Sequence, residues 1–572
     1  MNGMQLNMTR SFGLSSLRRP ALAGFLLGLA ATLALAGCGG DDSDSAGTDS
    51  SGDSEATAGE SSDASGGTTA GPGGNSSEGS GTGGATDASG GTSGGWGDGD
   101  GDGDGDGDGD GDGDGDGDGD GDGDGDGDGD GDADLCDDES DVLLYLSPDD
   151  SNSMASPVQV RERVLELGQT SLSGIFLRQW EFMNYYTFPY EPAPSKGLRI
   201  DLELEEGGAE GAYNLQIGVS SEALSNGARP PMNVTLVLDT SGSMSGTPME
   251  LLKESCRAIA ASLKAGDKVS MVEWDTENAW TLAGYQVEGP NDANLLSAIN
   301  ALEAGGGTDL NGGLVSGYEL AQAVYDQERI NRLVLVSDGG ANAGVTDVNL
   351  IAENADYGGQ DGIYLVGVGV GGGSYNDALM DTVTDAGKGA SVYIYDDEEA
   401  HLIFEERFVN TMAVAARDVQ VELALPPGFE IVKFSGEEFG GDPQEIEPQH
   451  ISPNDAMVFY QELETCAPEL VDSDTEVTVT VSYKHATTFV QNEIHKTMTV
   501  GELLGVEPAH MVKGKAIYKY SQGLADFRKA ETEEAQQIAL ESAISAVAAA
   551  YAEHPGDDEL YEALEVLNTL KN

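Results

Sequence analysis

Oxygen-bearing side chains cluster in the sequence DTSGSM at residues 239–244, directly after the apolar run NVTLVL at residues 233–238. Such a nearly continuous apolar run is typical of a strand that is buried on both faces. Ser241 and Ser243 stand two residues apart on the turn that follows, so both hydroxyls can point at one ion, and Asp239 adds a carboxylate. Mg²⁺ and Mn²⁺ are hard cations that prefer oxygen ligands. These residues are therefore suited to binding a divalent cation.

The elements around this turn alternate between buried strands and helices. Apolar runs of strand length occur at 233–238, 269–274, 332–337 and 362–370, and helical spacing of apolar residues occurs at 248–263, 294–302, 310–325 and 376–385. Strands that alternate with helices at this spacing predict a doubly wound, mostly parallel sheet. Such a sheet places ligands at the carboxyl ends of its strands, which is where the turn at 239–244 lies.

The polar residues at these strand ends match a known pattern. DTSGSM fits the D-x-S-x-S motif of von Willebrand factor A (vWA) and integrin I domains, a Thr follows in GGGTDL at 305–310, and an Asp ends the next buried strand in VSDG at 336–339. Residues from about 233 to 410 therefore resemble a vWA domain with a metal-ion-dependent adhesion site. The resemblance implies that Mg²⁺ or Mn²⁺ is bound directly or through water, with one position left for a carboxylate of a partner protein. The implied metal ligands are Asp239, Ser241, Ser243, Thr308 and Asp338.

Some of these residues have simpler interpretations. Ser and Asp are also common turn and helix N-cap residues, which any doubly wound domain contains. Asp309 could add a sixth ligand, but an acidic residue at the start of a helix is favoured by the helix dipole, and we predict that role. The sequence GVGVGG at 367–372 fits G-x-G-x-x-G, yet it follows a late strand rather than the first one, so we interpret it as a strand-end glycine loop.

The sequence lacks the motifs of the common enzyme classes. It contains no G-x-x-x-x-G-K-[ST], H-E-x-x-H or G-x-S-x-G, and its six His residues all lie outside the loops described above. No Cys and His set suits zinc. We therefore predict a protein-binding module for adhesion or complex assembly, not an enzyme, with no small-molecule cofactor. The alternative is a structural or regulatory component of a bacterial envelope complex, in which the metal site is vestigial or only stabilising.

The N-terminus has the features of an export signal. Arg10, Arg18 and Arg19 precede an apolar segment at 21–34 that is shorter than a membrane span. The following LAGC at 35–38 resembles the bacterial lipobox, which implies lipidation of Cys38 and an anchor in the cell envelope, with the outer membrane, the surface or the periplasmic face favoured. The formal net charge of −75 argues against nucleic acid as a partner.

The segment after the lipobox is rich in Gly, Ser, Thr and Asp, and residues 97–132 alternate strictly between Gly and Asp. This composition buries too little apolar surface to offset the entropy of ordering the chain, so a disordered tether is predicted. The Asp residues could bind Ca²⁺, but calcium-binding repeats carry an apolar core position that this run lacks. Loose counterion binding is the favoured interpretation.

The segments on both sides of the predicted α/β domain alternate between apolar and polar residues, as at 198–204, 213–219, 418–425 and 476–483. This pattern indicates half-buried strands, and we predict that the α/β domain is inserted into a β-sandwich-like module. The short sequences AARDV at 415–419 and NDA at 454–456 resemble those of bacterial vWA proteins of the YfbK-like type. Cys136 and Cys466 could form a disulfide, but the sequence does not fix the pairing.

A C-terminal helical segment completes the predicted organisation. Helices are expected at 511–529, 533–553 and 558–570, with Ile538, Ile544, Val547 and Tyr551 facing the core. The expected domains are the lipoprotein signal peptide (1–38), the tether (39–134), a β-rich N-terminal flank (135–230), the vWA domain (231–410), a β-sandwich-like domain (411–503) and the C-terminal helices (504–572).

Overall fold

The computed structural model describes residues 140–149, 152–341, 362–372 and 375–571. The chain divides into two units, residues 1–115 and 116–572, and all the described residues belong to the second unit. The predicted signal peptide, Cys38, the Gly-Asp run and Cys136 lie outside the described residues. Within the described ranges, no helix is both long enough and apolar enough to cross a membrane.

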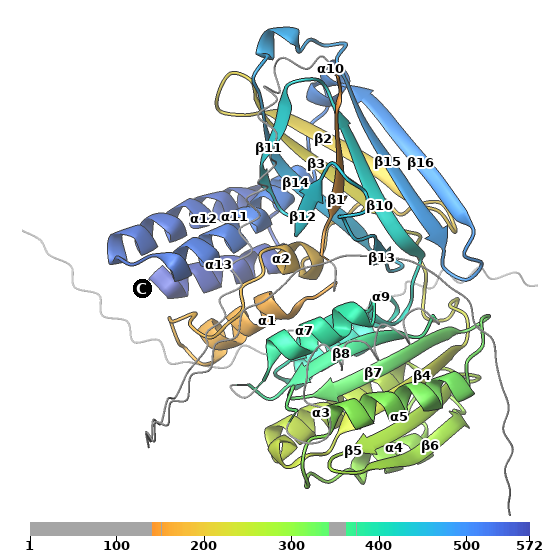
Figure 1. Ribbon diagram of the computed structural model, residues 1–572. Coiled ribbons are helices and arrows are strands. Elements are labelled where there is room, and N and C mark those ends of the chain that lie inside the picture. The colour runs from red at the N-terminus through yellow and green to blue at the C-terminus, as the bar shows by residue number, and fades with distance from the viewer. Residues whose placement is uncertain (1–139, 150–151, 342–361, 373–374, 572) are drawn as a thin grey trace, which may run out of the picture. The chain divides into compact units, whose positions relative to one another are not determined.

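Residues 232–412 form an α/β domain, which we call the inserted domain, around one six-stranded sheet (Figure 1). The strand order is β6-β5-β4-β7-β8-β9. Five of these strands, β5, β4, β7, β8 and β9, run parallel, and β6 is an antiparallel edge strand. Every residue of β4 and β8 is buried, as their apolar runs predict. The strands are β4 Met232–Asp239, β5 Lys268–Trp274, β6 Asn278–Gln286, β7 Ile330–Ser337, β8 Tyr364–Val370 and β9 Ala390–Ile394.

Helices cover both faces of this sheet, which confirms the doubly wound architecture predicted from the sequence. One face packs against α5 and α7. The other face packs against α3, α4 and the short helices α8 and α9 that end the domain. The helices are α3 Thr247–Ser262, α4 Ala293–Asn300, α5 Leu310–Ala323, α7 Asp377–Ala386, α8 Asp397–His401 and α9 Phe408–Met412.

Strands from before and after the inserted domain together build a module of two sheets. β1 (Val142–Ser147) pairs with β10 (Ala416–Leu425) in one sheet, and β3 (Ala212–Ser220) pairs with β14 (Ala456–Thr465) in the other. Apolar residues of both sheets share one core. The predicted insertion into a β-sandwich-like module is confirmed. The remaining strands are β2 Arg199–Glu206, β11 Phe429–Phe434, β12 Glu438–Gly440, β13 Gln449–Ile451, β15 Glu476–His485 and β16 Gln491–Thr499, and the short helix α10 (Val500–Leu504) follows β16.

Three C-terminal helices pack together with two helices that precede the inserted domain (Figure 1). The prediction that Ile538 faces this core was wrong, because its side chain is 64% exposed, whereas Val547 of the same helix is fully buried. Cys466 is disulfide-bonded, and its partner lies outside the described residues. The helices are α1 Ala155–Arg161, α2 Trp180–Tyr185, α11 Met511–Lys529, α12 Glu533–Glu553 and α13 Asp558–Lys571.

Candidate metal centre

The parallel register of the central strands brings two acidic residues to one edge of the sheet. β4 ends at Asp239 and β7 ends at Ser337, and Leu238 of β4 lies beside Val336 of β7. The next residues along the two strands, Asp239 and Ser337, are therefore neighbours, and Asp338 follows at once. The carboxyl ends of parallel strands form the edge where ligands bind in open α/β sheets.

Hydrogen bonds hold the turn after β4 in place. The Asp239 carboxylate accepts a bond from the Ser241 backbone N–H at 2.8 Å and another from the Ser337 hydroxyl at 2.6 Å. The Ser241 and Ser243 hydroxyl oxygens lie 3.1 Å apart. Asp239 and Ser241 are fully buried, whereas Ser243 is exposed. The turn therefore presents a hydroxyl at the surface, above buried oxygen ligands.

The glycine loop that carries Thr308 is joined to this turn by backbone hydrogen bonds. The Gly305 N–H donates to the Thr240 carbonyl at 2.7 Å, and the Gly242 N–H donates to the Gly306 carbonyl at 3.2 Å. Gly306 has a φ of 78°, in the left-handed region that favours glycine. The loop thus approaches the turn closely, and Thr308 beyond it is buried.

Thr308 and Asp338 face the same small space beside Gly340. A Cβ atom added at Gly340 would lie 3.3 Å from the Asp338 Oδ1 atom, 3.5 Å from the Thr308 methyl carbon and 3.9 Å from the Thr308 Oγ1 atom. The Gly340 backbone N–H donates to Asp338 Oδ1 at 3.2 Å. The absence of a side chain at this position leaves room beside both oxygen atoms.

The electrostatics of the site are those of two acids without a base. Burial raises the pKa of Asp239 to about 6, and the nearby charge of Asp338 adds to the rise. Among the ion pairs of the described residues, none joins Asp239 or Asp338 to Lys, Arg or His. Two buried carboxylates with adjacent hydroxyls fit a hard divalent cation, which would balance their charge. The described residues contain no cluster of three or more His, Cys, Asp or Glu side chains that could hold a metal, so hydroxyls must complete any ligand set here.

The structure brings all five sequence-predicted residues to one edge of the sheet. Asp309 is the N-cap of α5 and accepts a bond from the Gly312 N–H at 3.0 Å, which confirms its predicted helix role. The first four residues of GVGVGG end β8, so the predicted strand-end glycine loop is limited to Gly371 and Gly372. Sequence reasoning missed Ser337, whose hydroxyl also accepts from the Gly339 N–H at 2.9 Å. Ser337 reaches Asp239 because β7 pairs with β4. The one signal in the sequence is that a hydroxyl residue directly precedes Asp338.

The family model of the von Willebrand factor type A domain matches residues 233–406. The inserted domain is a von Willebrand factor type A domain. Over 201 residues the chain is 28% identical to the uncharacterized protein YfbK of Escherichia coli, covering 35% of this chain and 35% of YfbK. Over 232 residues it is 28% identical to the uncharacterized protein sll0103 of Synechocystis, covering 40% of this chain and 53% of that protein. The chain thus matches between about a third and a half of the length of these relatives.

A solved structure described as a von Willebrand factor type A protein from Catenulispora acidiphila is also similar. Its sequence identity is 16% and its TM-score is 0.42, and the match covers 65% of this chain and 96% of that chain.

Proposed function

We propose that the vWA domain binds a partner protein through a divalent cation, Mg²⁺ or Mn²⁺, held at the edge of the sheet. The observation that carries the proposal is the pair of buried carboxylates of Asp239 and Asp338, which lie beside three hydroxyls and have no basic partner among the described residues. A bound cation would supply a coordination position for an Asp or Glu carboxylate of the partner. The proposed metal ligands are Asp239, Ser241, Ser243, Thr308 and Asp338.

The chain's own residues would prepare this site before a partner arrives. The Ser337 hydroxyl and the Ser241 N–H fix both oxygen atoms of the Asp239 carboxylate. A carboxylate that is already oriented loses little conformational freedom on binding a cation. Ser243 is the exposed member of the set, so a partner carboxylate would approach beside it.

We further propose that lipid at Cys38 anchors the chain to the bacterial cell envelope. The support is the sequence LAGC after an apolar segment and the polar stretch that follows it. Lipid chains attach a protein to a membrane without spanning it.

Metal-dependent thermal unfolding tests the site. A cation that binds only the folded protein at about 100 times its dissociation constant adds about 2.7 kcal/mol of stability. The unfolding temperature of the full-length protein should therefore rise with Mg²⁺ or Mn²⁺ relative to EDTA, and Asp239→Ala should abolish this rise. Asp338→Asn should do the same, whereas the matched variant Asp309→Asn, which removes an equal charge one residue beyond Thr308, should keep it.

Gly340→Ala provides a test that leaves every proposed ligand in place. The new Cβ would occupy the space beside Asp338 Oδ1 and Thr308 Oγ1, so we expect weaker cation binding with an intact fold. The partner is then sought by metal-dependent capture, with EDTA and Asp338→Asn as controls. If neither cation raises the unfolding temperature of the wild type, metal-dependent binding is refuted and the structural or regulatory role is favoured.

A further inference from the structure

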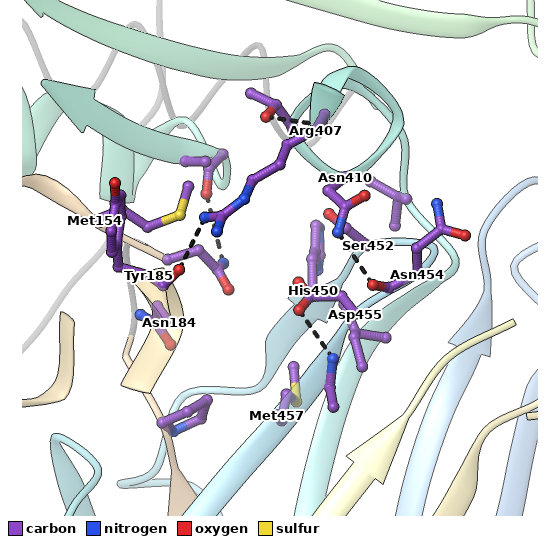
Figure 2. A pocket seen from close by; sticks show the side chains of 18 of the residues that line it. Met154, Asn184, Tyr185, Arg407, Asn410, His450, Ser452, Asn454, Asp455 and Met457 are labelled. Carbon is purple, nitrogen blue, oxygen red and sulfur yellow. Dashed lines mark hydrogen bonds between the residues drawn. The ribbon is translucent and has the colours of Figure 1, made fainter. Parts of the chain in front are cut away.

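A cavity of about 110 Å³ lies where the vWA domain meets the N-terminal helices and the two-sheet module (Figure 2). Arg332 of β7 lines it, at the opposite end of this strand from Asp338. At about 3.3 Å per residue, the two positions are separated by about 20 Å along the strand. The cavity is therefore distinct from the candidate metal centre.

The charge of the cavity lining is opposite to that of the whole chain. The cations Arg332, Lys388 and Arg407 line the cavity together with one acid, Asp455. Two of these cations also have acidic partners, because Lys388 pairs with Glu447 and Arg407 with Glu559, each at 3.2 Å. The chain has a net charge of −75 and only 27 Lys and Arg residues. Basic residues gathered in a concave site concentrate the positive potential there, which attracts anions.

Arg332 is a buried cation without an acidic partner. Arg332 is 4% exposed, and burial lowers the pKa of its guanidinium to about 10. The guanidinium therefore remains protonated at neutral pH. The guanidinium donates from Nε to the Met412 carbonyl at 3.0 Å and from Nη2 to the Ala413 carbonyl at 3.4 Å. Its Nη1 atom has no hydrogen-bond partner in the structure. Its Cζ atom lies 5.6 Å from the centroid of the Tyr364 ring, which compensates only part of the charge.

His450 contributes a second donor that lacks an acceptor. Its Nδ1 atom accepts a hydrogen bond from the Asp418 backbone N–H at 3.3 Å, so the proton of the neutral ring lies on Nε2. Burial lowers the pKa of His450 to about 3, with the charge of Arg332 among the contributing causes, so the ring is neutral at pH 7. The Nε2 atom is buried and has no partner. Arg332 and His450 thus both line the cavity, and each has a buried N–H group without a hydrogen-bond partner.

We propose that this cavity binds a small oxyanion, a carboxylate or a phosphate, through the Arg332 guanidinium and the His450 N–H. Water could accept both hydrogen bonds, but it would leave the guanidinium charge uncompensated, and a buried unpaired charge is costly. The cavity of about 110 Å³ has room for an occupant larger than one water molecule, which needs about 10–15 Å³ of such space. Lys388, which pairs with Glu447 at 3.2 Å and whose side chain is about one-third exposed, adds a cation at the edge of the cavity.

Arg407 and Asp455 also line the cavity, and Figure 2 shows both side chains. Arg407 donates to the Tyr185 carbonyl at 2.8 Å and pairs with Glu559 at 3.2 Å, so its position is fixed and part of its charge is balanced. The Asp455 carboxylate accepts a hydrogen bond from the Ala456 N–H at 2.9 Å and forms no ion pair with a described residue. Its negative charge opposes an anion, so its removal should strengthen binding.

The test is calorimetric titration of the full-length protein with sodium phosphate and with sodium acetate, in EDTA and against sodium chloride at matched ionic strength. EDTA removes any contribution from the candidate metal centre. We expect saturable binding of at least one oxyanion to the wild type and a higher unfolding temperature with that anion than with chloride. The two titrations also show whether the site prefers a phosphate or a carboxylate.

Variants connect the signal to this cavity. Arg332→Met should abolish binding, Lys388→Gln should weaken it by about tenfold, and Asp455→Asn should tighten it by a similar factor, because each changes one charge close to the anion. Arg257→Gln is the matched control, since Arg257 pairs with Glu254 on the surface of α3 at 2.7 Å and should leave binding unchanged. If Arg332→Met does not fold, Lys388→Gln and Asp455→Asn still decide the question. Equal responses to both oxyanions and chloride in the wild type, or equal affinities in all variants, would overturn the proposal.

Discussion

Replacement of Asp239 by Asn should stabilise the metal-free protein and remove its response to Mg²⁺. The Asp239 side chain is fully buried, and its pKa rises from 3.8 to about 6 in the fold. A shift of about 2 units corresponds to about 3 kcal/mol of lost stability at pH 7, where the carboxylate is ionised in both states. Asn keeps the shape of the side chain and the carbonyl oxygen that accepts the Ser241 N–H. The variant therefore removes the cost of the buried charge with little loss of hydrogen bonding.

The pH dependence of stability follows from the direction of this pKa shift. The folded metal-free protein holds the Asp239 proton more tightly than the unfolded chain does, because its folded pKa is raised. The contribution of this group to stability is therefore present below about pH 4, is lost as the pH rises to about 6, and stays lost above that. A bound cation favours the ionised form, so Mg²⁺ should reverse the loss. Asp239→Asn should show neither the loss nor the reversal.

The assay is denaturant unfolding in EDTA and in MgCl₂, at pH 5 and pH 7.5, for the wild type, Asp239→Asn and Asp309→Asn. All three proteins carry Trp180→Phe, because Trp180 lies in α2 outside the vWA domain. Trp274, which is fully buried in β5, and Trp280 of β6 then report on this domain within a chain of several modules. Our reasoning is refuted if Asp239→Asn is less stable than the wild type in EDTA at pH 7.5. It is equally refuted if MgCl₂ stabilises this variant as much as the wild type.

Three further changes test the packing and charge of the domain. Arg229 contacts the buried Asp267 carboxylate at 2.6 Å, and Arg229→Ala leaves this carboxylate without its cation. The variant should lose about 3–5 kcal/mol of unfolding free energy, measured by denaturant titration. Replacement of both residues by apolar ones should cost far less in the same titration. Gly313→Ala should destabilise the domain by about 1–3 kcal/mol in thermal unfolding, since its Cβ would lie 2.5 Å from the Trp274 ring. His450 has a pKa of about 3 in the fold, so only the unfolded chain takes up its proton as the pH falls below about 6.5, and stability declines by about 1.4 kcal/mol per pH unit. His450→Gln should flatten this decline, which denaturant titrations between pH 4.5 and 7 measure.

The sequence predicted most of the elements that bury a regular apolar pattern. The helices over 511–529 and 533–553 have the bounds expected from their periodicity, and Thr532 caps the second as its type suggests. The edge strand β6 was missed, because its residues are largely exposed and carry no buried alternation. An edge strand is defined by the neighbour to which it pairs, and sequence patterns do not contain that information.

The same limit applies to the sites. The candidate metal ligands follow a recognisable motif at strand ends, so each could be named before the structure was known. The cavity around Arg332 and His450 could not be foreseen, because these two residues are far apart in the chain and meet only where the vWA domain contacts the two-sheet module. An arginine in an apolar strand gives the only hint, since a charged residue is rarely buried without a partner.

The insertion of the vWA domain also sets the order in which the chain can fold. The vWA domain is continuous in sequence and can fold as soon as residues 232–412 are available. β1 and β3 must wait for β10 and β14, which are made only after the whole inserted domain. Long-range strand pairing is slow, and unpaired strand edges aggregate. Met232 and Met412, at the two ends of the inserted domain, belong to one core. A folded vWA domain therefore holds the two ends of the interruption together and lowers the entropic cost of closing the two-sheet module.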